Sequence, residues 1–132
     1  MDDLQERIRE WWSRQRFMDY LGVRLVECAE GYGKVAIRVG PHHLNAQGSA
    51  HGGVILALAD GAFAVSTATV APRGVGAQVN LHHIAPAQEG DELVAESRVI
   101  HPGRRSIVVE VNVSNGNGKL VARGTGLGMR IE

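Results

Sequence analysis

The feature that constrains this chain most is an apolar stretch from Gly52 to Pro72 that contains one charged residue, Asp60. Its length is close to the roughly 20 residues that a membrane-spanning helix needs. A carboxylate in the middle of the stretch argues against a membrane span, because ionised side chains are costly in lipid. We therefore predict a helix over residues 53–71 that is buried at the centre of a soluble domain and not inserted in a membrane.

The segments on either side of this stretch predict one more helix and six strands. Leu4, Ile8 and Trp11 recur at helical spacing, which predicts a helix over residues 3–18 with one apolar face. Apolar runs and turn signals predict strands over residues 21–29, 32–39, 75–84, 92–101, 105–114 and 119–131. Because short turns join the last four strands, we expect antiparallel pairing. One antiparallel sheet that curls around the buried helix fits this order, so we predict an α+β fold with residues 1–132 in one domain.

The charge balance and the cysteine and histidine content exclude several classes of function. Fourteen basic residues match fourteen acidic ones, and aromatic residues make up 5% of the chain, which argues against nucleic-acid binding. The single cysteine, Cys28, rules out an internal disulfide, and the charged N-terminus shows no signal peptide, so we expect a cytoplasmic location. Six histidines without H-x-x-x-H spacing predict no metal site. The glycine-rich run 124–128 lies inside a predicted strand, which favours close packing over phosphate binding.

Asp60 is the first candidate for chemistry. Its helical neighbours at three and four residues are Leu56, Ala57, Phe63 and Ala64, and none of them can pair with a carboxylate. A buried carboxylate without a partner is costly, and burial raises its pKa. Two interpretations stay open: a loop satisfies Asp60 with backbone hydrogen bonds, or Asp60 faces a cavity and acts in catalysis.

The start of the same helix is the second candidate. His51-Gly52-Gly53 precedes the apolar run, and the first N–H groups of a helix have no partner within the helix. Glycines there let a ligand approach the backbone, which would make an oxyanion hole. The alternative is that two glycines only permit a tight turn into the helix. Asn45, in the loop before it, is either a polar site residue or an ordinary turn residue.

These residues together resemble the hotdog-fold acyl-CoA thioesterases of the phenylacetate-degradation (PaaI) type. The family pattern H-x-N, H-G-G and L-x-D-x-A-F is matched by His43, Asn45, His51-Gly52-Gly53, Leu58, Asp60, Ala62 and Phe63. The family fold is a long helix wrapped by an antiparallel sheet, which agrees with the order of elements predicted above.

The resemblance implies hydrolysis of an aryl- or short- to medium-chain acyl-CoA to a free acid and CoA. It implies that the Gly52 N–H polarises the thioester carbonyl and that Asp60 is the general base on water or the nucleophile. Asn45 would hold water or substrate, and His51 would shape the loop. No cofactor is implied beyond coenzyme A, which is part of the substrate.

The resemblance also points to the contacts for coenzyme A. Gly53 and the turn Arg104-Arg105-Ser106 are implied to bind substrate, and an arginine there suits a phosphate, although an exposed basic turn is the plainer interpretation. The chain departs from the family pattern in two places. The stretch 82–86 reads HHIAP where an aromatic residue or leucine and then arginine often precede the proline, and Ala64 replaces a frequent Ser or Thr.

The spacing of Gly52 and Asp60 predicts a site shared between chains. Eight positions of helix separate them by roughly 12 Å along the axis, which is too far for both to reach one carbonyl group. Two antiparallel helices related by a two-fold axis solve this, so we expect a homodimer or a dimer-of-dimers tetramer.

Two other functions stay open at this stage. One is a hotdog dehydratase or hydratase of β-hydroxyacyl thioesters that uses His51 as a base. The other is a non-catalytic acyl-CoA-binding module, which would have no need of a buried Asp60.

Overall fold

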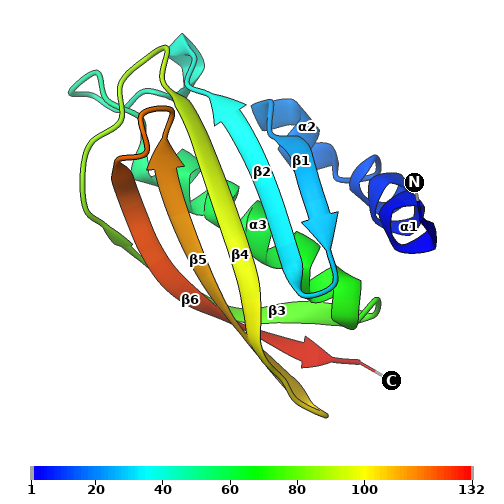
Figure 1. Ribbon diagram of the computed structural model, residues 1–132. Coiled ribbons are helices and arrows are strands. Elements are labelled where there is room, and N and C mark those ends of the chain that lie inside the picture. Colours follow the sequence, from blue (N-terminus) through cyan, green and yellow to red (C-terminus); the bar gives the residue numbers. More distant parts are fainter. Residues whose placement is uncertain (1, 132) are drawn as a thin grey trace.

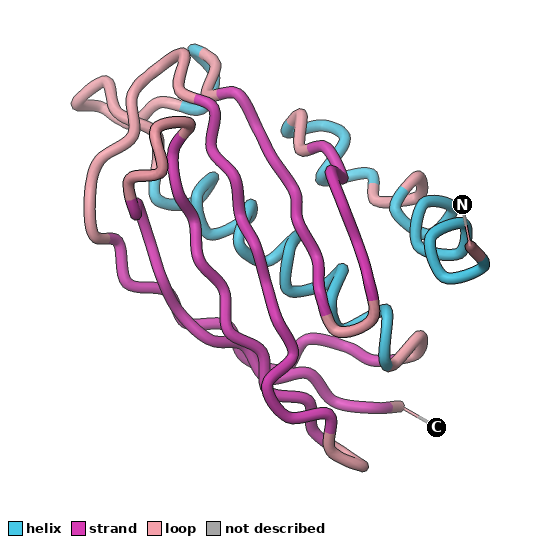
Figure 2. The backbone as a smooth tube through the Cα atoms, in the orientation of Figure 1, coloured by secondary structure: helices cyan, strands magenta, loops and turns pink. Residues whose placement is uncertain are grey.

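A curved sheet of six antiparallel strands wraps around the long helix α3 in the computed structural model, which describes residues 2–131 (Figure 1). The strand order across the sheet is β1-β2-β4-β5-β6-β3. The elements are α1 (Asp3–Trp12), α2 (Arg16–Leu21), β1 (Arg24–Ala29), β2 (Tyr32–Arg38), the 3-10 turn η1 (Pro41–His43), α3 (Gly52–Val70), β3 (Gly74–His83), β4 (Glu92–Pro102), β5 (Ser106–Asn115) and β6 (Leu120–Arg130). The sheet lies on one side of α3, and the two short N-terminal helices lie beyond β1 (Figure 2). The predicted α+β architecture is confirmed.

The N-terminal segment differs from the single helix predicted over residues 3–18. It consists of α1 and α2, separated by a turn at residues 13–15. The Ser13 hydroxyl donates a hydrogen bond to the Glu10 carbonyl oxygen at 2.6 Å, which competes with helix continuation. Gly22 ends α2 in the left-handed conformation, with φ of 91°. The central helix begins and ends one residue earlier than predicted.

Glycines on the concave face of the sheet allow α3 to pack closely. A Cβ atom on Gly126 of β6 would lie 2.9 Å from the Phe63 ring, and one on Gly33 of β2 would lie 2.7 Å from the Val65 side chain. Both distances are shorter than a carbon–carbon contact allows. Within the glycine-rich run of β6, Gly126 and Gly128 therefore serve helix packing, whereas a Cβ atom on Gly124 would clash with the Asn80 backbone of β3.

The burial of α3 also answers the question of membrane insertion. Within residues 2–131, it is the one helix long and apolar enough to cross a membrane. The sheet and the N-terminal helices bury 67% of its most apolar window inside the protein. The helix is thus the core of the fold.

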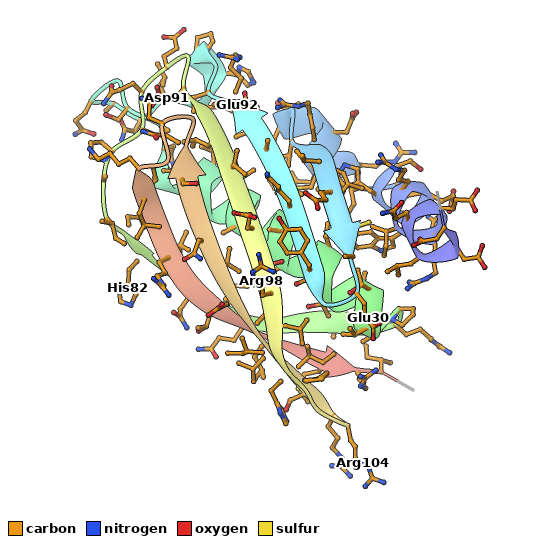
Figure 3. All side chains as sticks on the ribbon, in the orientation of Figure 1. Glu30, His82, Asp91, Glu92, Arg98 and Arg104 are labelled. Carbon is orange, nitrogen blue, oxygen red and sulfur yellow. The ribbon has the colours of Figure 1, made fainter. Side chains whose placement is uncertain are left out.

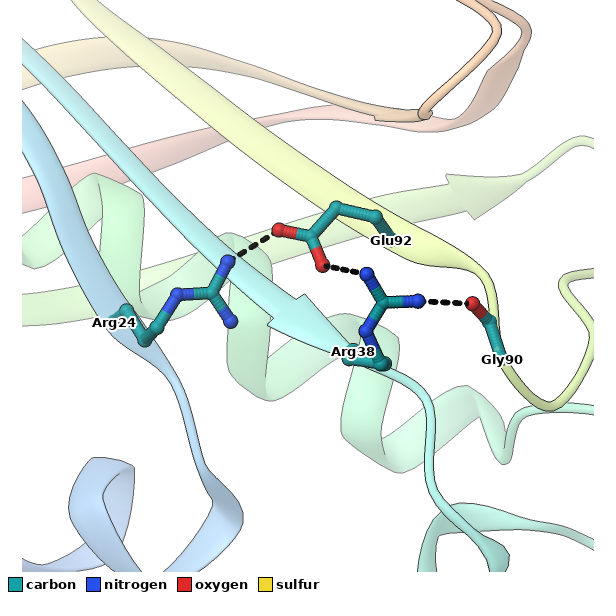
Figure 4. A network of polar contacts seen from close by, with 4 residues as sticks. All are labelled: Arg24, Arg38, Gly90 and Glu92. Atoms are coloured by element: carbon teal, nitrogen blue, oxygen red, sulfur yellow. Dashed lines mark hydrogen bonds and ion pairs between the residues drawn. The ribbon is translucent and has the colours of Figure 1, made fainter.

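Charged and polar side chains cover the convex face of the sheet. Glu92 of β4 forms ion pairs with Arg24 and Arg38, and Arg38 donates a hydrogen bond to the Gly90 carbonyl oxygen at 2.8 Å (Figure 4). Ion pairs as exposed as these contribute little stability. They keep this face of the sheet polar.

The two edge strands of the sheet differ in charge. The six residues of β1 include Arg24 and Glu27, and its pairing with β2 is interrupted by an irregularity between Leu25 and Glu27. The ten residues of β3 include no Asp, Glu, Lys or Arg, and Val75 in this strand is 46% exposed. The β3 edge is therefore the less protected one.

The packing of Phe63 on Gly126 gives a stability prediction. Gly126→Ala places a methyl group against the ring, and we expect it to lower the free energy of unfolding by about 1–3 kcal/mol. Gly116→Ala is the matched control, because its Cβ atom would have no neighbour closer than 3.9 Å. Urea denaturation of both variants measures the difference, and equal stability of the two would contradict the packing argument.

Candidate active site

One stripe of α3 escapes burial, and it carries the single charged residue of the helix. Gly53, Leu56, Ala57, Asp60 and Ala64 are exposed or half-buried and follow one another at spacings of one to four residues. The remaining positions from Val54 to Thr69 are buried against the sheet and the N-terminal helices. Within residues 2–131, a substrate or a second chain can therefore reach the middle of α3 only along this stripe.

Asp60 lies between two grooves on this face. One groove, of about 260 Å³, is lined by Trp11, Phe63, Ala64 and Thr67 among others. The other, of about 290 Å³, is lined by Phe17, Gly53, Leu56, Ala57 and Val79. The lining of the second groove is mostly apolar, whereas the first exposes more polar than apolar surface. The second groove therefore offers room for a small hydrophobic group next to a carboxylate.

The carboxylate of Asp60 has no partner within residues 2–131, where no hydrogen bond or ion pair to it is found. Burial raises its pKa above the ordinary value, and no neighbouring cation offsets this effect. Of the two interpretations of Asp60, the described residues match the one in which the carboxylate faces a cavity. A raised pKa makes the ionised form a stronger base.

The start of α3 leaves one N–H group unused. His51 is the N-cap residue, and its Nδ1 accepts a hydrogen bond from the Gly53 N–H at 2.8 Å. Within the described chain, no acceptor faces the Gly52 N–H. The Gly52 N–H is therefore the free hydrogen-bond donor at the start of α3. The Gly53 N–H is already bonded to His51, so Gly53 can meet a substrate only through its exposed Cα.

The loop before α3 is held by His43 and Asn45. His43 is buried, and its Nδ1 accepts a hydrogen bond from the Gly40 N–H at 2.9 Å while Nε2 lies 2.9 Å from the Leu21 carbonyl oxygen. The Asn45 Oδ1 accepts hydrogen bonds from two backbone N–H groups of its own loop, both at 3.0 Å. The carboxamide oxygen of Asn45 thus orders the loop, and its Nδ2 group is the part that can contact water or substrate.

The basic turn lies at the end of the β4–β5 hairpin, away from the loop before α3. Figure 3 shows Arg104 at the tip of this hairpin and Asp91 at the opposite end of the sheet. Arg130 donates hydrogen bonds to the Gly103 and Val70 carbonyl oxygens, which braces the hairpin against the C-terminal end of α3. One chain therefore does not bring Arg104, Arg105 and Ser106 next to Gly52.

Three residues beside the predicted ones lie at the site. Trp11 and Phe17 line the two grooves next to Asp60, and their placement depends on the turn between α1 and α2. His83, at the end of β3, lies against Gly52. Alternation along a strand places His82 and His83 on opposite faces, but the sequence does not show which of them faces α3. Within residues 2–131, no three His, Cys, Asp or Glu side chains are grouped to hold a metal ion.

Comparison with known proteins places this site in context. The family model described as "Thioesterase superfamily" matches residues 47–122. Acyl-coenzyme A thioesterase PaaI of Escherichia coli (strain K12) is 32% identical over 84% of this chain and 79% of its own length. Acyl-coenzyme A thioesterase 13 of Homo sapiens is 31% identical over 92% of this chain and 89% of its own length.

Solved structures agree with this similarity. The E. coli PaaI protein from the phenylacetic acid degradation operon has a TM-score of 0.94 at 27% identity, over 98% of this chain and 94% of that one. The structure of smu.793 from Streptococcus mutans UA159, bound to acetyl CoA, has a TM-score of 0.78 at 29% identity, over 82% of this chain and 87% of that one.

The burial of Asp60 gives a pH-dependent stability prediction. Because the folded pKa lies above the unfolded one, the folded protein is destabilised as the pH rises from about 4 through the folded pKa. We expect Asp60→Asn to gain stability relative to the parent over this range and to keep the gain at pH 7. Thermal unfolding at pH 4 to 7 measures it, with Asp19→Asn at an exposed position of α2 as the control. If the difference in thermal midpoint between Asp60→Asn and the parent grew as the pH fell towards 4, burial of the ionised carboxylate would not be the cause of the difference.

Proposed function

The chain belongs to the thioesterase superfamily, and on this premise we propose that it hydrolyses an acyl-CoA thioester to a free acid and CoA. The observation that carries the proposal is the accessible stripe of α3, in which a carboxylate with a raised pKa and no partner among the described residues lies between two grooves, one of them mostly apolar. The size and lining of the grooves favour an aryl or a short- to medium-chain acyl group. Coenzyme A enters only as part of the substrate, and a cytoplasmic location belongs to the same proposal.

We propose that each site is built from two chains. Gly52 and Asp60 lie roughly 12 Å apart along α3, whereas the oxyanion donor and the base must each lie about 3 Å from the reacting group. Two copies of α3 packed antiparallel along their accessible stripes would bring Gly52 of one chain to Asp60 of the other. Small residues on the stripe, Gly53, Ala57 and Ala64, would allow close approach.

The edge of the sheet supports the same arrangement. Strand β3 contains no Asp, Glu, Lys or Arg, its outer edge is unpaired within residues 2–131, and it contributes Val79 to the groove beside Asp60. Antiparallel pairing of two β3 strands about a two-fold axis would satisfy this edge and place the two α3 stripes on the same side of the joined sheet. A dimer of such dimers would give the tetramer.

The chemistry of the shared site follows from the two groups. The Gly52 N–H donates a hydrogen bond to the carbonyl oxygen and stabilises the negative charge that develops there. Asp60 accepts a proton from water as the water oxygen bonds to the carbonyl carbon. The C–S bond then breaks, and the proton passes from Asp60 to the CoA thiolate. In the alternative route, Asp60 itself attacks the carbonyl carbon, the C–S bond breaks and CoA leaves as a thiolate. Water then hydrolyses the resulting mixed anhydride, which releases the acid, regenerates the Asp60 carboxylate and supplies the proton that the thiolate takes up.

The remaining site residues take supporting roles in this proposal. His51 holds the Gly53 N–H, so that the first turn of α3 has a fixed geometry, and the Nδ2 group of Asn45 contacts water or substrate. Arg104, Arg105 and Ser106 bind the phosphates at the nucleotide end of CoA.

The two other functions are less well supported by the geometry. A dehydratase would use His51 as its base, but the Nδ1 of His51 already accepts the Gly53 N–H. A pure acyl-CoA-binding module would carry the unfavourable burial of Asp60 without any gain. Hydration and hydrolysis assays on one acyl-CoA panel separate all three.

The shared site gives a complementation prediction. We expect Asp60→Asn to fold, to bind acyl-CoA and to lose about 10²–10⁴-fold in kcat. Gly52→Pro removes the oxyanion donor, and proline suits the first helical position after His51, whose φ of −63° and ψ of 138° are extended. Mixing the two inactive proteins should restore activity, because half of the sites in a mixed dimer carry both groups.

Gly52→Ala is the matched control for this experiment, since it keeps the N–H and its Cβ atom would lie 3.5 Å from the nearest neighbour. It should remain active. Mixed dimers that form and show no recovered activity, or a fully active monomer, would show that the site is not shared.

The proposed CoA contacts give a kinetic prediction. Replacing both Arg104 and Arg105 by Ala removes charged hydrogen bonds to phosphate, and we expect KM to rise about tenfold with little change in kcat. Arg123→Ala, an exposed arginine on the convex face of β6, is the control. Equal inhibition of the double variant and the parent by free CoA would exclude the contact.

A further inference from the structure

The start of α3 meets a histidine for which the proposed reaction has no role so far. His83 is the last residue of β3. A Cβ atom on Gly52 would lie 3.5 Å from Cε1, 3.7 Å from Nε2 and 4.0 Å from Nδ1 of His83. These three atoms form the polar edge of the imidazole ring, so this edge faces the residue whose N–H group is free.

The sheet register explains why His83 faces the helix and His82 does not. His83 pairs with Ala122 of β6, which is fully buried on the concave face, and His82 pairs with the exposed Arg123. Figure 3 shows the His82 side chain projecting outward from the sheet. His83 is exposed, and no hydrogen bond to its ring is found within residues 2–131, so a ligand can reach it.

We propose that His83 donates a second hydrogen bond to the thioester carbonyl oxygen, beside the Gly52 N–H. A Cβ atom lies about 2.5 Å from the backbone nitrogen of its own residue. With the 3.7 Å from this Cβ position to the His83 Nε2, the Nε2 is at most about 6.2 Å from the Gly52 nitrogen, and any bend at the Cβ atom shortens this distance. Two N–H···O hydrogen bonds of about 2.7–3.2 Å each span up to about 6.4 Å. One oxygen atom between the two donors can therefore accept from both.

This role rests on the proposed function, because it needs a carbonyl oxygen at Gly52. A neutral imidazole has one N–H donor, and a protonated one has two. Negative charge develops on the oxygen only as the carbonyl carbon is attacked, so the second donor acts mainly on kcat and not on substrate binding. Gly52 and His83 belong to the same chain, so each chain supplies a complete oxyanion pocket and takes the carboxylate from its partner.

Two substitutions of His83 and one of the neighbouring His82 test this role. His83→Phe keeps a ring against Gly52 and removes the donor, and we expect kcat to fall about 10²-fold while KM stays within about threefold. His83→Gln keeps an amide donor and should recover at least about tenfold of that loss. His82→Phe is the matched control on the convex face and should keep the kcat of the parent within about twofold.

The outcomes separate this role from the proposed function. If His83→Phe keeps its kcat while Gly52→Pro is inactive, the role of His83 is wrong and the proposed function stands. If His83→Phe and His83→Gln lose the same kcat, hydrogen-bond donation is also wrong. If the parent hydrolyses no acyl-CoA, or Gly52→Pro keeps its kcat, both proposals fall. Should His83→Phe lower the thermal midpoint, His83→Leu removes the donor in a smaller side chain and is judged by the same criteria.

Discussion

The close packing of α3 on the concave face of the sheet determines which face of this helix stays accessible. Phe63 and Val65 fit against Gly126 and Gly33, and neither strand could carry a larger residue at these positions without moving the helix. Because three sides of α3 are buried by this packing, the helix can turn only one narrow stripe outward. Asp60 lies on that stripe, so its access to solvent and substrate is a consequence of core packing.

The same constraint creates a conflict between stability and chemistry. A carboxylate on an apolar helix is destabilising when it has no partner, and the described residues provide none for Asp60. An aspartate held in this way keeps a raised pKa, which is the property that the proposed role of general base requires. Proteins commonly accept such a local loss of stability at sites where it serves the reaction.

The architecture and the position of the central helix could be predicted from the sequence, because both depend on local patterns. An apolar run of helical length, alternating strands and short turns leave few arrangements other than a helix wrapped by an antiparallel sheet. The unusual setting of Asp60 and Gly52 could be predicted too, since a lone charge and a pair of glycines stand out in an apolar segment. Their roles in hydrolysis stay predictions.

Other features of the site could not be predicted, because they depend on contacts between distant segments. The turn at residues 13–15 decides that Trp11 and Phe17 flank Asp60, and the sequence predicted one continuous helix there. The pairing of β3 with β6 decides that His83 and not His82 faces α3. The hydrogen bonds of the loop occupy the Oδ1 of Asn45, so only its Nδ2 group is left to contact water or substrate. None of these three features produces a periodic pattern in the sequence.

The unequal edges of the sheet have a consequence for assembly size. A sheet with two equally open edges could add copies without limit and grow into a fibre. Here β3 is free of full charges, whereas β1 carries Arg24 and Glu27 and an irregularity in its pairing. In the proposed dimer, pairing through β3 would be self-limiting, because two chains joined through this edge would expose only their two β1 edges. The charged side chains and the irregular pairing of β1 thus oppose the addition of further strands at the two ends of such a joined sheet.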